Sequence, residues 1–259
     1  MSLLDRYFIK KPAVREAVTR ALYGDKDVSV CLMGDQLTIN TLKENGYFRA
    51  SKACKNYSVF RDEAIVLQNI ASLIRDGSTF IDVGANIGLF SSAIARVAKL
   101  KHEVDVIAFE VDPDTFQRLS QNAEQHGFRA KNVGLSNIRG SKTFVRGAVS
   151  HVTTVLEKKN SYNMARRTFD GQLLPLDDLD LGDKPKFIKI DVEGAELEVL
   201  EGAKKLLERN EIYGIYFDGL DQYSEAKAML TSYGFSFFNG RTLEPSSTNT
   251  FSILALLDA

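Results

Sequence analysis

Two glycines and an acid at residues 82–88 are the first place in this chain where residue types and spacing point to chemistry. An apolar run ends in Asp82, and Gly84 and Gly88 follow before a second apolar segment begins. A strand that turns into a helix at glycines leaves its backbone bare, so a ligand can lie against the main chain and reach the free amides of the helix. The pattern predicts a binding turn for a small polar ligand.

Two common nucleotide-binding patterns do not fit this turn. A dinucleotide-binding turn would place glycines at 84, 86 and 89, but the chain has Asn86 and Leu89 at the last two positions. A phosphate-binding loop also fails, because no Gly-Lys-Ser/Thr sequence follows. The charge of Asp82 would repel a phosphate and attract an ammonium or sulfonium group. S-adenosylmethionine carries both groups, and we expect it as the ligand.

A second acid, Glu110, ends the next apolar run, which reads as a strand from Val104. In a βαβ unit the tip of the second strand lies next to the turn that follows the first. A carboxylate there can accept hydrogen bonds from both hydroxyls of a ribose. The alternative is a solvent-facing or helix-capping role before Asp112-Pro113, and the glycine turn upstream favours the ribose. Weaker signals at Gly134 and Leu135 indicate the place of the adenine.

The segment at residues 187–196 repeats the pattern of an apolar strand that ends in an acid before a glycine and a helix. The carboxyl ends of neighbouring parallel strands meet at one edge of a sheet, so Asp191 should lie across from Gly84. Lys189 should project to the same side of the strand as Asp191, because side chains alternate along a strand.

Three roles are open for Asp191 at that position. It can orient an acceptor hydroxyl, take its proton, or hold a divalent metal together with Glu193 and Asp218. Glu193 has an equally supported alternative as a cap of the following helix. The sequence predicts Asp191 and Glu193 as catalytic residues, with Asp191 also beside the cofactor, and leaves the metal open.

An alternation of helices and strands is expected to position these motifs. Residues 1–59 read as an N-terminal extension, a helix followed by a β-hairpin cap, and residues 60–259 as the main domain. Asn45-Gly46 reads as a turn within the β-like part of the extension. Helices are expected at 12–23, 62–74, 89–99, 113–126 and 224–232, and strands at 28–33, 37–42, 104–110, 132–136, 142–146, 187–191, 212–217, 235–238 and 251–257.

Bulk composition narrows the class of protein. The chain has 259 residues, 44% of them hydrophobic, which is enough for one substantial core. Its formal net charge of −1 gives no electrostatic reason to expect a nucleic-acid partner. The two cysteines, Cys31 and Cys54, are expected to be buried and inert, as in a reducing compartment. No segment approaches a membrane span, so we expect a soluble, cytoplasmic protein without a membrane partner.

Residues 147–180 are the least regular part of the sequence. They contain His151, the pairs Lys158-Lys159 and Arg166-Arg167, and the acidic pair Asp177-Asp178. A segment of this kind beside a cofactor site often shapes the substrate site. The alternative is a solvated surface excursion, which the charge pairs favour.

Together these motifs resemble the FkbM-type methyltransferases, a branch of the class I S-adenosylmethionine-dependent enzymes. The resemblance runs from about Phe60 to the C-terminus. It rests on Ile81-Asp-Val-Gly-Ala-Asn-Ile-Gly at 81–88, Phe109-Glu-Val-Asp-Pro at 109–113 and Ile188-Lys-Ile-Asp-Val-Glu-Gly-Ala-Glu at 188–196. It implies an α/β fold with a Rossmann-like, seven-stranded, mostly parallel sheet and an antiparallel C-terminal strand. It implies a cofactor site lined by Asp82, Gly84, Ala85, Asn86, Gly88 and Glu110.

The usual reaction in that family is methylation of a hydroxyl on a sugar, a glycan or a natural product. The resemblance therefore implies a small-molecule or glycan acceptor as partner, and it leaves the oligomeric state open. Two alternatives remain at this point. A nicotinamide-dependent oxidoreductase would use Glu110 equally well, although the glycines it needs at 86 and 89 are missing. A non-catalytic module would keep the fold for partner contacts.

Overall fold

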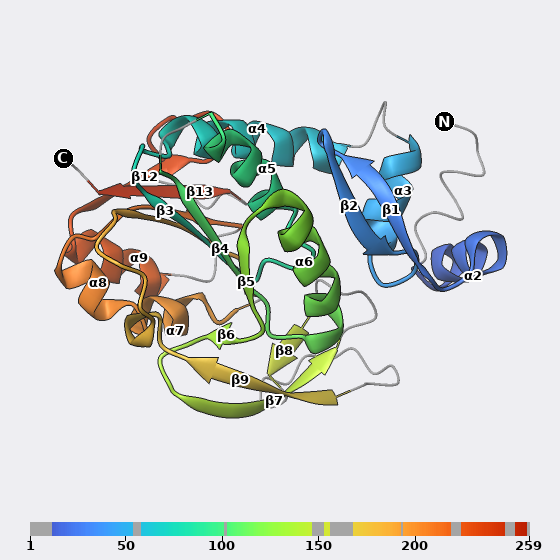
Figure 1. The fold of residues 1–259 in the computed structure, drawn as a ribbon. Helices are drawn as coiled ribbons and strands as arrows, with labels where there is room; N and C mark the ends of the chain where they lie inside the picture. Colours follow the sequence, from blue (N-terminus) through green and yellow to red (C-terminus); the bar gives the residue numbers. More distant parts are fainter. Residues whose placement is uncertain are drawn as a thin grey trace.

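The computed structural model describes residues 12–53, 58–100, 103–146, 153–155, 168–192, 194–218, 224–246 and 252–257. In this part of the chain a seven-stranded sheet has the order β12-β13-β11-β10-β3-β4-β5 (Figure 1). Neighbouring strands run parallel, except that β13 runs antiparallel to both β11 and β12. This confirms the predicted fold class. The strands are β3 (Thr79–Val83), β4 (Asp105–Phe109), β5 (Arg129–Lys131), β10 (Lys186–Ile190), β11 (Ile212–Phe217), β12 (Phe235–Asn239) and β13 (Ile253–Leu257).

Helices cover both faces of this sheet, so its central strands β3 and β10 are buried along their whole length. Phe80 and Phe187 pack on one face against α4 and α5, while their neighbours Ile81 and Ile188 pack on the other. Successive strand side chains point to opposite faces, which explains the unbroken apolar runs in the sequence. One face carries α4 (Ser58–Leu73), α5 (Leu89–Ala98) and α6 (Pro113–His126), and the other α7 (Glu196–Glu201), α8 (Lys204–Glu208) and α9 (Ser224–Ser232).

The N-terminal extension contains a helix, a hairpin and a second helix. They are α2 (Pro12–Tyr23), the antiparallel pair β1 (Asp27–Leu32) and β2 (Asp35–Asn40), and α3 (Asn45–Ala53). The turn predicted at Asn45-Gly46 is wrong, because these residues begin α3. The backbone N–H of Phe48 donates to the carbonyl oxygen of Glu44 at 2.9 Å, an i to i−4 bond that forms a helical turn instead of reversing the chain. The domain boundary expected after residue 59 falls inside α4.

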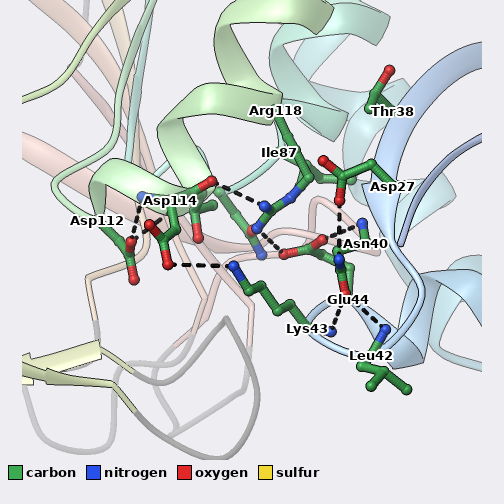
Figure 2. A network of polar contacts seen from close by, with 12 residues as sticks. Asp27, Thr38, Asn40, Leu42, Lys43, Glu44, Ile87, Asp112, Asp114 and Arg118 are labelled. Atoms are coloured by element: carbon green, nitrogen blue, oxygen red, sulfur yellow. Dashed lines mark hydrogen bonds and ion pairs between the residues drawn. The ribbon is translucent and has the colours of Figure 1, made fainter. Parts of the chain in front are cut away.

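The extension is attached to α6 by buried polar contacts (Figure 2). Glu44 and Arg118 form an ion pair at 2.7 Å in which both side chains are almost fully buried. Asn122 accepts from the backbone N–H of Thr38 at 2.7 Å and donates to the carbonyl of Ile87 at 2.8 Å. An apolar cluster joins the hairpin to the segment after the glycine turn. The extension therefore packs directly against the elements that hold the predicted cofactor turn.

A second sheet lies beside the central one, with the order β6-β9-β7-β8. Its strands are β6 (Gly134–Leu135), β7 (Gly140–Arg146), β8 (Thr153–Val155) and β9 (Thr168–Leu174), and the short 3-10 helix η1 (Leu176–Asp178) follows. The strand predicted at 132–136 is present in part as β6, but it belongs to the second sheet, and the edge strand of the central sheet is β5. Much of the irregular 147–180 segment, including His151 and the two basic pairs, lies outside the described residues.

Two further expectations concern cysteines and membranes. Cys31 is exposed, so its predicted burial is wrong: it lies in β1 on the face of the two-stranded hairpin that the core does not cover. Cys54 lies outside the described residues. Among the helices of the described ranges, none combines the length and the apolar character needed to cross a bilayer.

Candidate active site

The glycine turn follows β3 and packs closely against the ends of the neighbouring strands β4 and β10. The N–H groups of Gly84 and Ala85 both donate to the carbonyl oxygen of Phe109, at 3.0 and 2.9 Å. Gly84 has φ +73°, and a Cβ added there would lie 1.9 Å from the backbone oxygen of Asp191. Gly88 has φ +82°, and an added Cβ would lie 2.7 Å from a side chain of α6. Only glycine fits at either position, and the backbone at Gly84 touches the backbone at Asp191.

Glu110 lies directly after β4 and is bound to the turn. Its Oε2 accepts from the N–H of Asn86, and its Oε1 accepts from the N–H of Asp112, each at 2.9 Å. Burial raises the pKa of Glu110 to about 7, although the two backbone N–H donors oppose the shift. Each carboxylate oxygen keeps a second lone pair, which a ribose hydroxyl can use. The residue therefore has the chemistry expected of a ribose ligand.

Asn86 gives a second test of whether an adenosyl cofactor fits. Its backbone has φ +53°, and its Oδ1 is buried with no hydrogen-bond partner among the described residues. A buried acceptor without a donor is costly, so an ordered donor is expected beside it. The free acceptor, the bare backbone at Gly84 and the half-used carboxylate of Glu110 together fit a ligand that carries hydroxyl and ammonium donors.

The charge of Asp82 was expected to face the ligand, but the side chain points into the protein. The side chain is fully buried, accepting from Lys189 Nζ at 3.0 Å and from Ser91 Oγ at 2.7 Å. Burial favours the neutral form of Lys189 and so lowers its pKa. The negative charges of Asp82 and Asp191 have the larger combined effect, and the pKa of Lys189 is raised above its usual value. The charge of Asp82 is therefore balanced inside the protein, where it holds Lys189 and the first turn of α5.

Asp191 lies at the carboxyl end of β10, beside the turn. Its N–H donates to the carbonyl of Val83 at 3.1 Å, and its carboxylate lies 3.6 Å from Lys189 Nζ. This confirms that Lys189 and Asp191 share one side of the strand. The Asp191 side chain is 41% exposed, so a second molecule can reach it. Glu193, the other predicted catalytic residue, lies outside the described residues.

Further polar side chains lie at this edge of the sheet, and of these only Asp218 was named from the sequence. Burial, followed by the negative charge of Asp218, raises the pKa of Glu63 to about 7. Burial and then the charge of Glu63 raise the pKa of Tyr47 well above its usual value. Tyr216 hydrogen-bonds Asp218, whose pKa is raised by burial and then by Asp191. Tyr47, Glu63 and Tyr216 come from α3, α4 and β11, and no local motif marks these three.

Two predictions about ligands remain as predictions. Gly134 lies in β6, where an added Cβ would be 3.3 Å from the side chain of Val111, and Leu135 is buried beside it. This places both near the segment that follows Glu110, as an adenine site requires. Within the described residues, no group of three or more His, Cys, Asp or Glu side chains could hold a metal ion.

Comparison with known proteins identifies the family. The family model "Methyltransferase FkbM domain" matches residues 82–237, more than half of the chain. The chain belongs to the FkbM methyltransferase family. This membership supports the methyltransferase prediction over the oxidoreductase alternative, whose dinucleotide pattern the turn also lacks.

Relatives of this FkbM chain include methyltransferases from an archaeon and a fungus. The hexuronic acid methyltransferase AglP of Haloferax volcanii is 30% identical over 152 residues, which cover 57% of this chain and 59% of that protein. The methyltransferase sdnD of Sordaria araneosa is 30% identical over 177 residues, which cover 56% of this chain and 66% of that protein. The matches thus span less than two thirds of these relatives.

One solved structure supports the fold of the FkbM chain. The crystal structure of a methyltransferase FkbM from Methylobacillus flagellatus has a TM-score of 0.50 at 17% identity. The likeness covers 71% of this chain and 44% of that one. At this identity the match shows the shared Rossmann-like fold alone.

Proposed function

We propose that this protein is an S-adenosylmethionine-dependent O-methyltransferase that methylates a hydroxyl of a sugar, a glycan or a small natural product. The observation that carries the proposal is the contact between the backbones of Gly84 and Asp191. It brings a turn suited to an adenosyl cofactor against a reachable carboxylate on the neighbouring strand. A cofactor and an acceptor bound on these two segments would be adjacent.

The roles of the residues follow from their positions. Glu110 binds the ribose hydroxyls with the lone pairs that its two backbone donors leave free. Asn86 offers its unpartnered Oδ1 to a donor of the cofactor. Gly84, Ala85 and Gly88 keep the turn bare, and Gly134 and Leu135 border the adenine. When bound, the cofactor supplies an electrophilic methyl group on a sulfonium.

Asp191 acts on the acceptor side of the turn. Its exposed carboxylate accepts a hydrogen bond from a hydroxyl of the acceptor and so aims the reacting oxygen at the methyl carbon. The ammonium group of Lys189 forms an ion pair with that carboxylate, and a second ion pair with Asp82 holds Lys189 in place. Alignment of this kind is the main source of rate in a methyl transfer, since it replaces a bimolecular encounter by an oriented one.

The choice of acceptor class rests on the relatives. AglP is described as a hexuronic acid methyltransferase, which supports a sugar hydroxyl as the acceptor of this chain. Hydroxyl-bearing acceptors also suit a site whose reachable side chains are carboxylates, because carboxylates accept hydrogen bonds from hydroxyls.

Two measurements test the proposal. Calorimetry should show S-adenosylhomocysteine binding to the purified protein. Incubation with S-adenosylmethionine and a panel of methyl hexosides and methyl hexuronides should then release S-adenosylhomocysteine together with a product heavier by one methylene. A folded protein that gives no binding heat with S-adenosylhomocysteine would refute the cofactor assignment. Binding without turnover on any acceptor would favour a non-catalytic module.

A further inference from the structure

The carboxylates at the acceptor side differ in how far their oxygens are already used. Asp82 is fully buried and has a donor on each oxygen. Asp191 is paired with the Lys189 ammonium, and Asp218 accepts from Tyr216. A carboxylate already bound to an internal cation or donor is a poorer proton acceptor than a free one.

Glu63 stands apart from these three. It lies on α4, which packs on the face of the sheet that also carries α5. Its Oε2 is buried and has no hydrogen-bond partner among the described residues. A buried carboxylate oxygen without a donor is expensive to keep, and the cost falls when a ligand hydroxyl donates to it.

The charges around Glu63 place it at the strand ends. Its carboxylate interacts electrostatically with Asp218 after β11 and with Lys189 and Asp191 of the β10 end, while Tyr47 approaches from α3. α4 leads into β3 through residues 74–78 and packs along it, so the N-terminal part of the helix, which carries Glu63, lies level with the carboxyl end of β3. Glu63 therefore shares the acceptor side with Asp191, and the extension contributes Tyr47 to the same place.

Building on the proposed function, we propose that Glu63 is the general base of the methyl transfer, and that its free Oε2 receives the proton of the acceptor hydroxyl. The acceptor oxygen forms a bond to the methyl carbon as the carbon–sulfur bond breaks, and the bonding pair stays on sulfur. The hydroxyl proton passes to Glu63, which becomes a neutral carboxylic acid and later releases the proton to water. Because the reacting hydroxyl has a single proton and gives it to Glu63, Asp191 orients the acceptor through a neighbouring hydroxyl.

The protonation behaviour of Glu63 suits this role. Burial, the largest cause, together with the charges of Asp218 and Asp191 raises the pKa of Glu63 to about 7, although Lys189 opposes the shift. A base works best when its pKa lies close to the working pH, because it is then ionised and still basic. Since the carboxylate is the active form, kcat should rise as the pH increases through about 7 and level off above it.

The first experiment compares variants in S-adenosylhomocysteine release, using the best acceptor of the methyl hexoside and hexuronide panel. Glu63→Gln should lower kcat about 10²-fold or more and remove the rise near pH 7, with S-adenosylhomocysteine affinity unchanged within about twofold. Glu63→Asp should keep part of the activity and a shifted rise. Gln68→Glu, at an exposed position of the same helix, should match the wild type.

The second experiment needs no acceptor. Carboxyl-¹³C labelling of glutamate followed by NMR titration, with S-adenosylhomocysteine bound so that Glu110 is engaged, should show a resonance with a midpoint near 7 that Glu63→Gln removes. A Glu63 midpoint near the ordinary glutamate value would overturn the proposal.

The outcomes separate the two proposals. A wild-type protein that fails to bind S-adenosylhomocysteine contradicts the proposed function. A wild type that binds and turns over, together with Glu63→Gln retaining kcat and its pH dependence, contradicts only the role of Glu63. If Asp191→Asn lost the rise of kcat with pH while Glu63→Gln kept it, the general base would be Asp191 instead.

Discussion

The two sides of the glycine turn are built by different means. On the cofactor side, Glu110 is held by backbone N–H groups of Asn86 and Asp112, all within one βαβ unit. On the acceptor side, Glu63 and Asp191 come from elements far apart in the chain. The cofactor side therefore depends on local backbone geometry and the acceptor side on tertiary packing. A fold can keep the first constant while the second changes with the acceptor.

The same contrast appears in how the two raised glutamate pKa values arise. At Glu110, burial is opposed by two backbone donors that favour the ionised form. At Glu63, burial is reinforced by the neighbouring carboxylates Asp218 and Asp191. The surroundings of Glu110 therefore suit a carboxylate that accepts hydrogen bonds, and those of Glu63 suit a carboxylate that accepts a proton.

Gly84→Ala should have the largest effect, because Gly84 contacts both the cofactor side and the acceptor side of the turn. The new Cβ would lie 1.9 Å from the Asp191 backbone oxygen at φ +73°. We expect the free energy of unfolding to fall by about 3 kcal/mol or more, and S-adenosylhomocysteine affinity to fall by about 100-fold or more. Chemical denaturation and calorimetry measure the two effects.

Gly77→Ala is the matched control for this substitution. Gly77 also has a left-handed backbone, with φ +68°, but an added Cβ meets nothing within 4 Å. It should cost about 1 kcal/mol of stability and leave S-adenosylhomocysteine binding intact. Equal losses of binding in the two variants would show that backbone conformation alone, and not contact with Asp191, accounts for the effect.

Asp191→Ala separates the two sides. The carboxylate is reachable on the acceptor side, whereas its backbone supports the cofactor turn and stays in place. Turnover should fall about 10²-fold or more, with S-adenosylhomocysteine affinity within about threefold of the wild type. If cofactor affinity fell as much as turnover, the Asp191 side chain would belong to the cofactor side.

The sequence was informative where function is local. Asp82 lies near the end of an apolar strand, and Gly84, Glu110 and Asp191 directly follow one. The parallel sheet brings these strand ends together, so the proximity of the four residues could be predicted. The burial of Asp82 under Lys189 could not, because an acid at a strand end looks the same whether it meets a ligand or an internal ammonium.

The acceptor side and the extension were beyond sequence reasoning for a physical reason. Glu63 looks like an ordinary acid near a helix start, and its special state depends on charges supplied by β10 and β11. Asn45-Gly46 has turn chemistry, but packing of α3 against the hairpin overrides it. The sequence predicts strands at 132–136 and 142–146, which overlap β6 and β7, but not that they pair with β8 and β9 in a second sheet.

Arg118→Met tests how the extension supports the acceptor side. The substitution would leave the fully buried Glu44 without its cation, and breaking such a pair costs about 3 kcal/mol. Thermal unfolding should detect this loss. Combining it with Glu44→Gln should restore much of the stability, because no unpaired buried charge remains. The result bears on the acceptor side because α3 carries Tyr47. An Arg118→Met variant with full stability would show that the extension is held by its apolar contacts alone.

Glu110→Gln gives the smallest expected effect and the most specific one for the cofactor side. The pKa of Glu110 is raised to about 7, and ribose hydroxyls donate only to the ionised carboxylate at full strength. S-adenosylhomocysteine affinity of the wild type should therefore weaken as the pH falls below about 7, by up to about tenfold per pH unit.

The Glu110→Gln variant should bind about tenfold more weakly than the wild type above pH 7 and lose that pH dependence, with kcat at saturating cofactor preserved. Because the folded-state pKa of Glu110 is raised from 4.5 to about 7, its ionisation lowers the free energy of unfolding progressively between these pH values and fully above pH 7. The stability of the cofactor-free wild type should therefore fall more between pH 4.5 and 7 than that of the variant. A variant that keeps the pH-dependent affinity would move the titrating group away from Glu110, and the next glutamate to test is Glu63 across the turn.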